Sequence, residues 1–275
     1  MAPTRIGRLF ERVRNEGRPA LVAYVTAGDP SPDRTPAIIA ALERGGADLI
    51  ELGVPFSDPI ADGPVIQRGA ARALAAGATV ATVLDIASEI RRHSEIPILL
   101  FTYMNPILRF GLQSLAHEAA DRGIDGCLMI DLSVEEAGPY VEAMRGHGLD
   151  TVFIAAPTST PERLKLVAQY SSGFVYVVSR TGVTGERDAL SQSVGPLVQS
   201  MRSITDLPLA VGFGISSADH VRSVGAIADG VVVGSGFVRT LEMYRNTPEL
   251  EQRMEERARE LAGGLPRRAV PVRTA

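Results

Sequence analysis

Short runs of consecutive apolar residues recur along the chain, and each is followed by a longer segment in which apolar residues return every three or four positions. Uninterrupted apolar runs are typical of strands that are buried on both faces, and the longer spacing is typical of helices with one buried side. The runs predict eight strands, at 21–26, 48–52, 96–101, 125–130, 150–155, 173–178, 207–211 and 230–233.

The segments between these runs predict helices. We expect them at 6–13, 35–44, 65–76, 80–93, 111–122 and 134–145, from 160 onward, at 190–201, after 216, at 235–240 and at 248–261. Eight strand–helix units in about 250 residues predict an α/β protein, a (β/α)8 TIM barrel with an extra N-terminal helix and added short helices. The alternative, a doubly wound open sheet, would be expected to carry a Gly-x-Gly-x-x-Gly turn after the first strand, and residues 26–30 (TAGDP) lack it. We expect one domain over 1–275, with a flexible tail from about 263 to 275.

Composition narrows the class of protein. The chain is 45% hydrophobic and 22% charged with a net charge of −4, which is ordinary for a soluble protein and argues against nucleic acid or an anionic membrane as its main partner. No apolar run approaches the roughly 18 residues of a membrane span. Cys127 is the only cysteine and lies in an apolar stretch, so we expect a core residue in a protein of the reducing cytoplasm.

One strand and the loop after it carry the strongest candidates for chemistry. Glu51 lies inside the apolar run at 48–52, and Asp62 lies in the proline-stiffened loop that follows. Chemistry in a barrel takes place at the C-terminal ends of the strands, so both carboxylates are expected on the working face as acid/base groups. The alternatives are a structural carboxylate for Glu51 and a helix cap or turn residue for Asp62. Asp58, before Pro59, is better explained as a turn residue.

Three glycine-rich loops on the same face suggest a phosphate site. They occupy 181–185, 212–216 and 234–236, and the last two follow the seventh and eighth strands, where this fold usually binds phosphate. Glycines let backbone N–H groups approach an anion, which makes Gly214, Gly234 and Ser235 candidates, although ordinary tight turns are the alternative. The first loop could also close over a substrate, and Thr184 could then reach Asp62; a merely exposed loop is the alternative.

Other kinds of chemistry are poorly supported. Lys165, the only lysine, falls in a helix and is expected to face solvent, which disfavours Schiff-base chemistry. The four histidines (His93, His117, His147 and His220) are expected to lie far apart, and no cluster has the spacing of metal ligands. These exclusions leave proton transfer by two carboxylates on a small phosphorylated molecule.

Several of these segments together resemble a known family, the tryptophan synthase alpha subunits. The longest match is 50–67, which reads IELGVPFSDPIADGPVIQ. It is joined by 103–106 (YMNP), 156–160 (APTST), 179–185 (SRTGVTG), 212–215 (GFGI) and Gly234-Ser235, and the resemblance covers roughly residues 5–262.

The resemblance implies a reaction, retro-aldol cleavage of indole-3-glycerol phosphate to indole and glyceraldehyde 3-phosphate. It implies that Glu51 is the general acid/base and that Asp62 binds the indole N–H. It further implies aromatic residues near the indole at Tyr24 and Tyr176, and an apolar pocket wall at Leu128 and Ile154. The phosphate-binding positions that it implies are Gly185, Phe213, Gly214, Gly234 and Ser235.

The same resemblance implies a partner, a tryptophan synthase beta subunit in an α2β2 heterotetramer. Pyridoxal phosphate is then expected on the beta subunit, with no cofactor or metal on this chain. Two alternatives remain open: a stand-alone lyase that releases free indole, and a catalytically silent activator of a beta subunit, which the intact carboxylates argue against. Ser133 and Gly236 depart from the family pattern, and Ser133 does so in a region of subunit contact.

Overall fold

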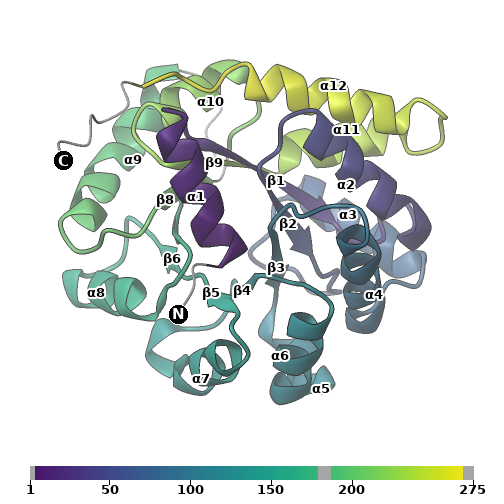
Figure 1. The fold of residues 1–275 in the computed structure, drawn as a ribbon, viewed down its shortest axis with the longest axis horizontal. Helices are drawn as coiled ribbons and strands as arrows, with labels where there is room; N and C mark the ends of the chain where they lie inside the picture. The colour runs from purple at the N-terminus through teal and green to yellow at the C-terminus, as the bar shows by residue number, and fades with distance from the viewer. Residues whose placement is uncertain (1–3, 179–186, 213, 269–275) are drawn as a thin grey trace.

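The computed structural model describes residues 4–178, 187–212 and 214–268, with the backbone alone from 187 to 193. Its strands are all parallel and form a single sheet, in the order β5-β4-β3-β2-β1-β9-β8-β7-β6 (Figure 1). The strands are β1 (Ala20–Thr26), β2 (Leu49–Gly53), β3 (Ile98–Thr102), β4 (Gly126–Met129), β5 (Asp150–Thr151), β6 (Ile154–Ala155), β7 (Val175–Val178), β8 (Leu209–Gly212) and β9 (Gly230–Val233).

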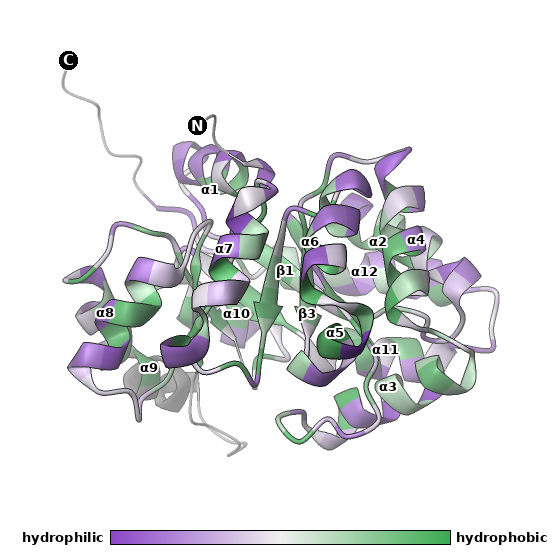
Figure 2. Cartoon of the chain, turned by 90° about the horizontal axis from the view of Figure 1, so that it is seen from below, coloured by the Kyte–Doolittle hydropathy of each residue, from purple (hydrophilic) through white to green (hydrophobic). Residues whose placement is uncertain are grey.

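Helices surround this sheet. They are α1 (Arg5–Asn15), α2 (Thr35–Arg44), α3 (Pro64–Ala75), α4 (Val80–Arg91), α5 (Met104–Phe110), α6 (Leu112–Asp121), α7 (Gly138–Gly146), α8 (Pro161–Tyr170), α9 (Arg187–Arg202), α10 (Ala218–Gly225), α11 (Ser235–Tyr244) and α12 (Leu250–Ala262), with short 3-10 turns η1 (Pro32–Arg34) and η2 (Val134–Glu136). Figure 2 shows the apolar residues on the central strands and the polar residues on the outer helix faces.

The expected fifth strand is divided, and this division closes the barrel. Its first half, β5, pairs with β4, and its second half, β6, pairs with β7. Between them, the N–H of Val152 bonds to Cys127 O at 3.0 Å and Phe153 O accepts from the N–H of Tyr176 at 3.0 Å. The segment therefore bonds to β4 with its first half and to β7 with its second half, which closes the sheet and confirms the predicted barrel.

One helix was missed by the pattern. The Asn-Pro pair at 105–106 predicts a loop, whereas α5 begins at Met104. A proline in the first turn loses no helical hydrogen bond, because the first N–H groups of a helix have no partner within it. The expected helix at 134–145 also divides, into η2 and α7.

Two buried layers make up the core. Ile50, Leu52 and their equivalents face the helices, and alternate residues such as Leu49 and Leu99 fill the barrel interior. Helix α1 closes the N-terminal end of the barrel, where Ile6, Leu9 and Phe10 pack into the interior cluster (Figure 1). With that end closed, the C-terminal ends of the strands remain for the site.

We call the closed N-terminal end the floor of the barrel. Aspartates at the N-terminal ends of the strands hold this floor in place. Asp48, Asp125 and Asp150 each follow a Gly-x pair whose glycine has a positive φ, between +74° and +104°. Asp48 accepts from the N–H of Leu21 at 2.9 Å, and Asp125 accepts from that of Ile98 at 2.8 Å. Helix α1 and its cap reach all three carboxylates, through Arg12, Arg5 and Thr4 respectively.

Among the described residues, no single helix is long and apolar enough to cross a membrane; only α3 and α4 taken together, bent by 94°, meet the criteria of length and composition.

Candidate active site

The strand register places Glu51 in the barrel interior beside an aromatic residue. Glu51 aligns with Tyr24 on β1 and with Leu99 on β3. Side chains alternate along a strand, so Leu49, Glu51 and Gly53 point inward while Ile50 and Leu52 point toward the helices. A charged residue type thus occupies the inner face of the strand, above the apolar floor.

The Glu51 carboxyl group is buried without a charged partner. The residue is 1% exposed, and its Oε1 atom has no hydrogen-bond partner among the described residues. Burial without compensation disfavours the charged form, and it raises the pKa of Glu51 to about 8. A carboxyl group that holds its proton at neutral pH can act as a general acid and, once it has given up the proton, as a base.

Asp62 lies on the loop between β2 and α3, half-buried at the same end of the barrel. Its Oδ2 atom accepts a hydrogen bond from the Tyr103 hydroxyl at 3.1 Å, and its backbone N–H bonds to Pro59 O at 3.0 Å. Burial raises the pKa of Asp62 to about 6, while the Tyr103 hydrogen bond lowers it. Asp62 is therefore mostly ionised at neutral pH, whereas Glu51 is mostly protonated.

Tyr103 and Phe101 are parts of this site that the sequence analysis did not single out. Tyr103 follows the end of β3 and touches Asp62, and Phe101 packs edge-on against Tyr24 with ring centroids 5.4 Å apart. The available signal was position: aromatic residues at and just beyond a barrel strand's C-terminal end face the site.

The structure brings the expected wall residues together. The interior cluster contains Tyr24, Tyr176 and Leu128, and Ile154 packs against it. Each tyrosine hydroxyl lies over a glycine of the next strand, Tyr24 over Gly53 and Tyr176 over Gly212, where a Cβ atom would overlap it.

A cavity of about 280 Å³ adjoins this wall near the segments that follow β4 and β6. Ile130 and Ile154 both contribute to its lining.

The predicted phosphate loops are described in part. Gly214 is exposed with φ +75°, a conformation that favours glycine. Gly234 caps α11, and Ser235 is its first residue, where backbone N–H groups have no partner within the helix. Thr184, Gly185 and Phe213 lie outside the described residues, so the structure brings only part of this set to the site.

The two departures from the family pattern have local explanations. A Cβ atom at Gly236 would lie 3.1 Å from Cγ1 of Val233, so glycine relieves a tight contact. The Ser133 hydroxyl donates to the Glu135 carboxylate at the start of η2. Neither residue touches Glu51 or Asp62.

The expected positions of the basic residues hold with one correction. Lys165 is exposed on α8, as predicted. The histidines are not all far apart, because the exposed rings of His117 and His147 meet with centroids 5.8 Å apart. Residues distant in sequence meet here because α6 and α7 are adjacent. Within the described ranges, no group of three or more His, Cys, Asp or Glu residues could hold a metal ion.

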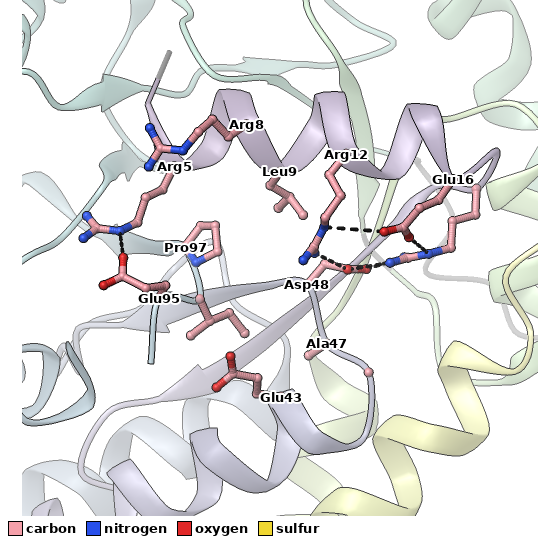
Figure 3. Close-up of a pocket in the computed structure, with 13 residues that line it drawn as sticks. Arg5, Arg8, Leu9, Arg12, Glu16, Glu43, Ala47, Asp48, Glu95 and Pro97 are labelled. Atoms are coloured by element: carbon pink, nitrogen blue, oxygen red, sulfur yellow. Dashed lines mark hydrogen bonds and ion pairs between the residues drawn. The ribbon is translucent and has the colours of Figure 1, made fainter. Parts of the chain in front are cut away.

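A larger cavity, of about 580 Å³, lies at the opposite end of the barrel beneath α1 (Figure 3). Its charged lining is paired: Arg5 binds Glu95, and Arg12 and Arg18 both bind Asp48. None of the candidate site residues lines it. At the C-terminal end, by contrast, the buried Glu51 carboxyl group has no such ion pair with any residue that the structure describes.

Comparisons with known proteins agree with this geometry. The model of the family "Tryptophan synthase alpha chain" matches residues 10–265. A tryptophan synthase alpha chain of Solibacter usitatus is 63% identical over 97% of this chain and 100% of its own length. Another, from Geobacter sp. (strain M21), is 46% identical over 90% of this chain and 93% of its own.

Solved structures agree as well. The crystal structure of tryptophan synthase subunit alpha from Legionella pneumophila has a TM-score of 0.88 at 32% identity and covers 96% of this chain and 98% of its own. A chain of the tryptophan synthase a2b2 complex from Pyrococcus furiosus has a TM-score of 0.83 at 42% identity, and it covers 89% of this chain and 98% of its own. The chain therefore belongs to the tryptophan synthase alpha chain family, the lyases of tryptophan biosynthesis that cleave indole-3-glycerol phosphate.

Proposed function

We propose that Glu51 and Asp62 carry out the family's reaction in this chain. Indole-3-glycerol phosphate is cleaved by a retro-aldol reaction to indole and glyceraldehyde 3-phosphate. Glu51 moves the protons, and Asp62 binds the indole N–H and stabilises the positive charge that develops on the ring. The observation that carries this assignment is the buried Glu51 carboxyl group on a barrel strand, whose Oε1 atom has no hydrogen-bond partner in the described ranges.

The protons balance on Glu51 alone. Protonated Glu51 gives its proton to the indole ring carbon at the bond to be broken. The resulting carboxylate then takes the proton of the adjacent glycerol hydroxyl as the carbon–carbon bond cleaves, and the bonding electrons return to the ring. Glu51 ends the cycle protonated, as it began. Separated pKa values for the two carboxyl groups, about 8 and about 6, support these opposite roles.

The remaining residues of the site bind the two ends of the substrate. Tyr24, Tyr176, Leu128 and Ile154 would surround the indole ring, and Thr184 would reach Asp62 from its loop. Backbone N–H groups at Gly214, Gly234 and Ser235 would hold the phosphate, joined by Gly185 and Phe213. The positive end of the α11 dipole favours an anion there.

For the partner we propose a beta subunit in an α2β2 complex, which receives the indole. Ile60, on the Asp62 loop, is 87% exposed, and Leu108, on α5, is 62% exposed. Both residues lie on segments that follow neighbouring strands, β2 and β3, and exposed large apolar side chains there favour a protein interface. Pyridoxal phosphate would be held by that subunit, since Lys165 lies on the outer face of α8. A reducing cytoplasm suits the single buried cysteine, Cys127.

Indole release from indole-3-glycerol phosphate, measured with and without purified beta subunit, tests the assignment. Strong stimulation by the beta subunit supports the α2β2 complex, and fast release by the chain alone supports a stand-alone lyase. No release under either condition would leave only a silent activator. In the same assay, Ile60→Ser should weaken the stimulation, whereas Met243→Ser, which changes another exposed apolar residue on α11 (71%), should not.

A further inference from the structure

Within the described residues, the carboxylate of Asp62 is held by a single side chain. Its Oδ2 atom accepts from the Tyr103 hydroxyl at 3.1 Å, and its Oδ1 atom has no partner among the residues that the structure describes. The same hydroxyl oxygen accepts from the backbone N–H of Ala61 at 3.1 Å. One phenol group therefore holds both the carboxylate and the backbone of the residue before it.

Tyr103 is itself held firmly. It is 3% exposed, and its ring packs on Phe56, in the loop between β2 and α3, with centroids 5.2 Å apart. The next residue, Met104, donates its backbone N–H to the Asp131 carboxylate at 2.7 Å, which ties the start of α5 to the segment after β4. Tyr103 is thus anchored by β3, which it follows, and by the segment after β4, and from there its hydroxyl contacts the Asp62 loop.

We propose that Tyr103 is a positioning residue that keeps Asp62 ionised and aims its free oxygen at the indole N–H. The proposal rests on the proposed function of Asp62. By occupying Oδ2, Tyr103 leaves Oδ1 for the substrate. Because the Ala61 N–H polarises the phenol oxygen, the hydroxyl becomes a better donor to the carboxylate.

The surroundings of Asp62 give Tyr103 this influence over its charge. Burial raises the pKa of Asp62, and donation from Tyr103 is the interaction that opposes it. Among the described residues, the other titratable groups that face this region are Tyr24 from β1, Tyr176 from β7 and Glu51 from β2, together with Asp131 beside Tyr103. None of these groups is a cation, so none stabilises the ionised form of Asp62 by its charge.

The pH dependence of kcat/KM provides the first test. We expect kcat/KM to rise with pH as Asp62 ionises, and we call this rise the acid limb. In Tyr103→Phe, the acid limb should move to higher pH by up to about one unit, because the ionised form of Asp62 loses a hydrogen bond. The matched control is Tyr140→Phe, which removes another buried hydroxyl, one that donates to Cys127 O at 2.5 Å away from the site. It should leave the acid limb in place. An unmoved limb in a folded Tyr103→Phe variant would overturn the proposal.

Binding of two small probes provides the second test. The chain has no tryptophan, so the fluorescence of indole and of 1-methylindole can be followed without tryptophan emission from the protein. The native chain should prefer indole about tenfold or more, since only indole can donate an N–H to a carboxylate. Tyr103→Phe should reduce this preference, and Tyr140→Phe should keep it. Phe56→Leu loosens the Tyr103 ring and should therefore shift the acid limb and reduce the indole preference as well, each by less than Tyr103→Phe. It replaces Tyr103→Phe in both tests if that variant does not fold.

A double substitution separates this inference from the proposed function. If Asp62→Asn suppresses cleavage and adding Tyr103→Phe causes no further loss, Tyr103 acts through Asp62. Full additivity of the two losses would overturn the proposal while leaving the role of Asp62 intact. Normal cleavage by Asp62→Asn would instead overturn the proposed function itself.

Discussion

The hydroxyl group of Tyr24, on β1, lies directly over the Cα atom of Gly53 on the neighbouring strand β2. Gly53→Ala should therefore displace the Tyr24 ring, lowering the turnover and costing about 1–3 kcal/mol of stability from overpacking. Indole release and thermal unfolding measure the two effects. Gly146→Ala, at a helical glycine where a Cβ atom meets open space, is the matched control. Adding Tyr24→Phe removes the obstructing oxygen and should restore part of the stability; no recovery would contradict the steric explanation.

Replacement of Glu51 by glutamine should abolish most of the proton transfer. Glu51→Gln keeps the shape of the side chain but cannot exchange a proton, so turnover should fall about 10²–10⁴-fold. Circular dichroism should show the fold retained. Indole release at the native rate would rule out Glu51 as the acid/base.

The same substitution should change stability in a pH-dependent way. The pKa of Glu51 is raised from 4.5 to about 8 in the folded chain, so the folded form retains a proton that the unfolded chain releases. Its contribution to stability is present below about pH 4.5 and is lost as the pH rises toward 8. Relative to the native chain, Glu51→Gln should gain up to several kcal/mol near pH 8 and little near pH 4. Urea unfolding at both pH values measures this difference.

The two carboxyl groups should give a bell-shaped dependence of kcat/KM on pH. Activity should rise through about pH 6 as Asp62 ionises and fall through about pH 8 as Glu51 loses the proton that it donates. In Glu51→Gln, the residual activity should lack the alkaline limb. A residual profile that still falls near pH 8 would assign that limb to another group.

Asp62 and Asp58 lie on one loop but should respond differently. Asp62→Asn removes the negative charge that stabilises the indole cation, and activity of the isolated chain should fall about 10²-fold or more. Asp58 is exposed, and within the described part of the chain its carboxylate accepts only from the neighbouring Ser57 hydroxyl, so Asp58→Asn should leave that activity near native. Equal losses in the two variants would indicate a disturbed loop rather than a specific role.

The floor of the barrel offers a test of stability alone. Asp48 is nearly buried and binds Arg12, Arg18 and the N–H of Leu21. Asp48→Ala leaves these donors without their acceptor and should cost about 3–5 kcal/mol. Asp85→Ala, which breaks an exposed ion pair with Arg122, should cost about 1 kcal/mol or less. Urea unfolding compares the two variants, and similar losses would contradict the proposed role of burial.

Much of the fold follows from local pattern. The helix at 35–44 and the strand at 230–233 have the predicted bounds, because their periodicity and their glycine or capping signals agree. The prediction failed where a local signal has two structural outcomes. Asn105-Pro106 can mark a loop or a first helical turn, and the run at 150–155 gives no sign that its halves pair with different neighbours.

The candidate site divides in the same way. Glu51 could be found from the sequence, since a carboxylate within an apolar run is costly unless it has a function. Tyr103 could not be found in this way, because its importance comes from contacts with Ala61 and Asp62, about 40 positions earlier in the chain.

The sequence by itself determined the order of strands and helices, the barrel class and the two carboxylates, since these depend on periodicity and on the cost of burying charge. Only the tertiary structure decided which side chains meet at the ends of the strands. It placed Glu51 beside Tyr24 without a charged partner, and it joined Asp62 to Tyr103. Charge state depends on burial and on neighbours from distant segments, and the folding of the chain into a closed barrel is what brings those neighbours together.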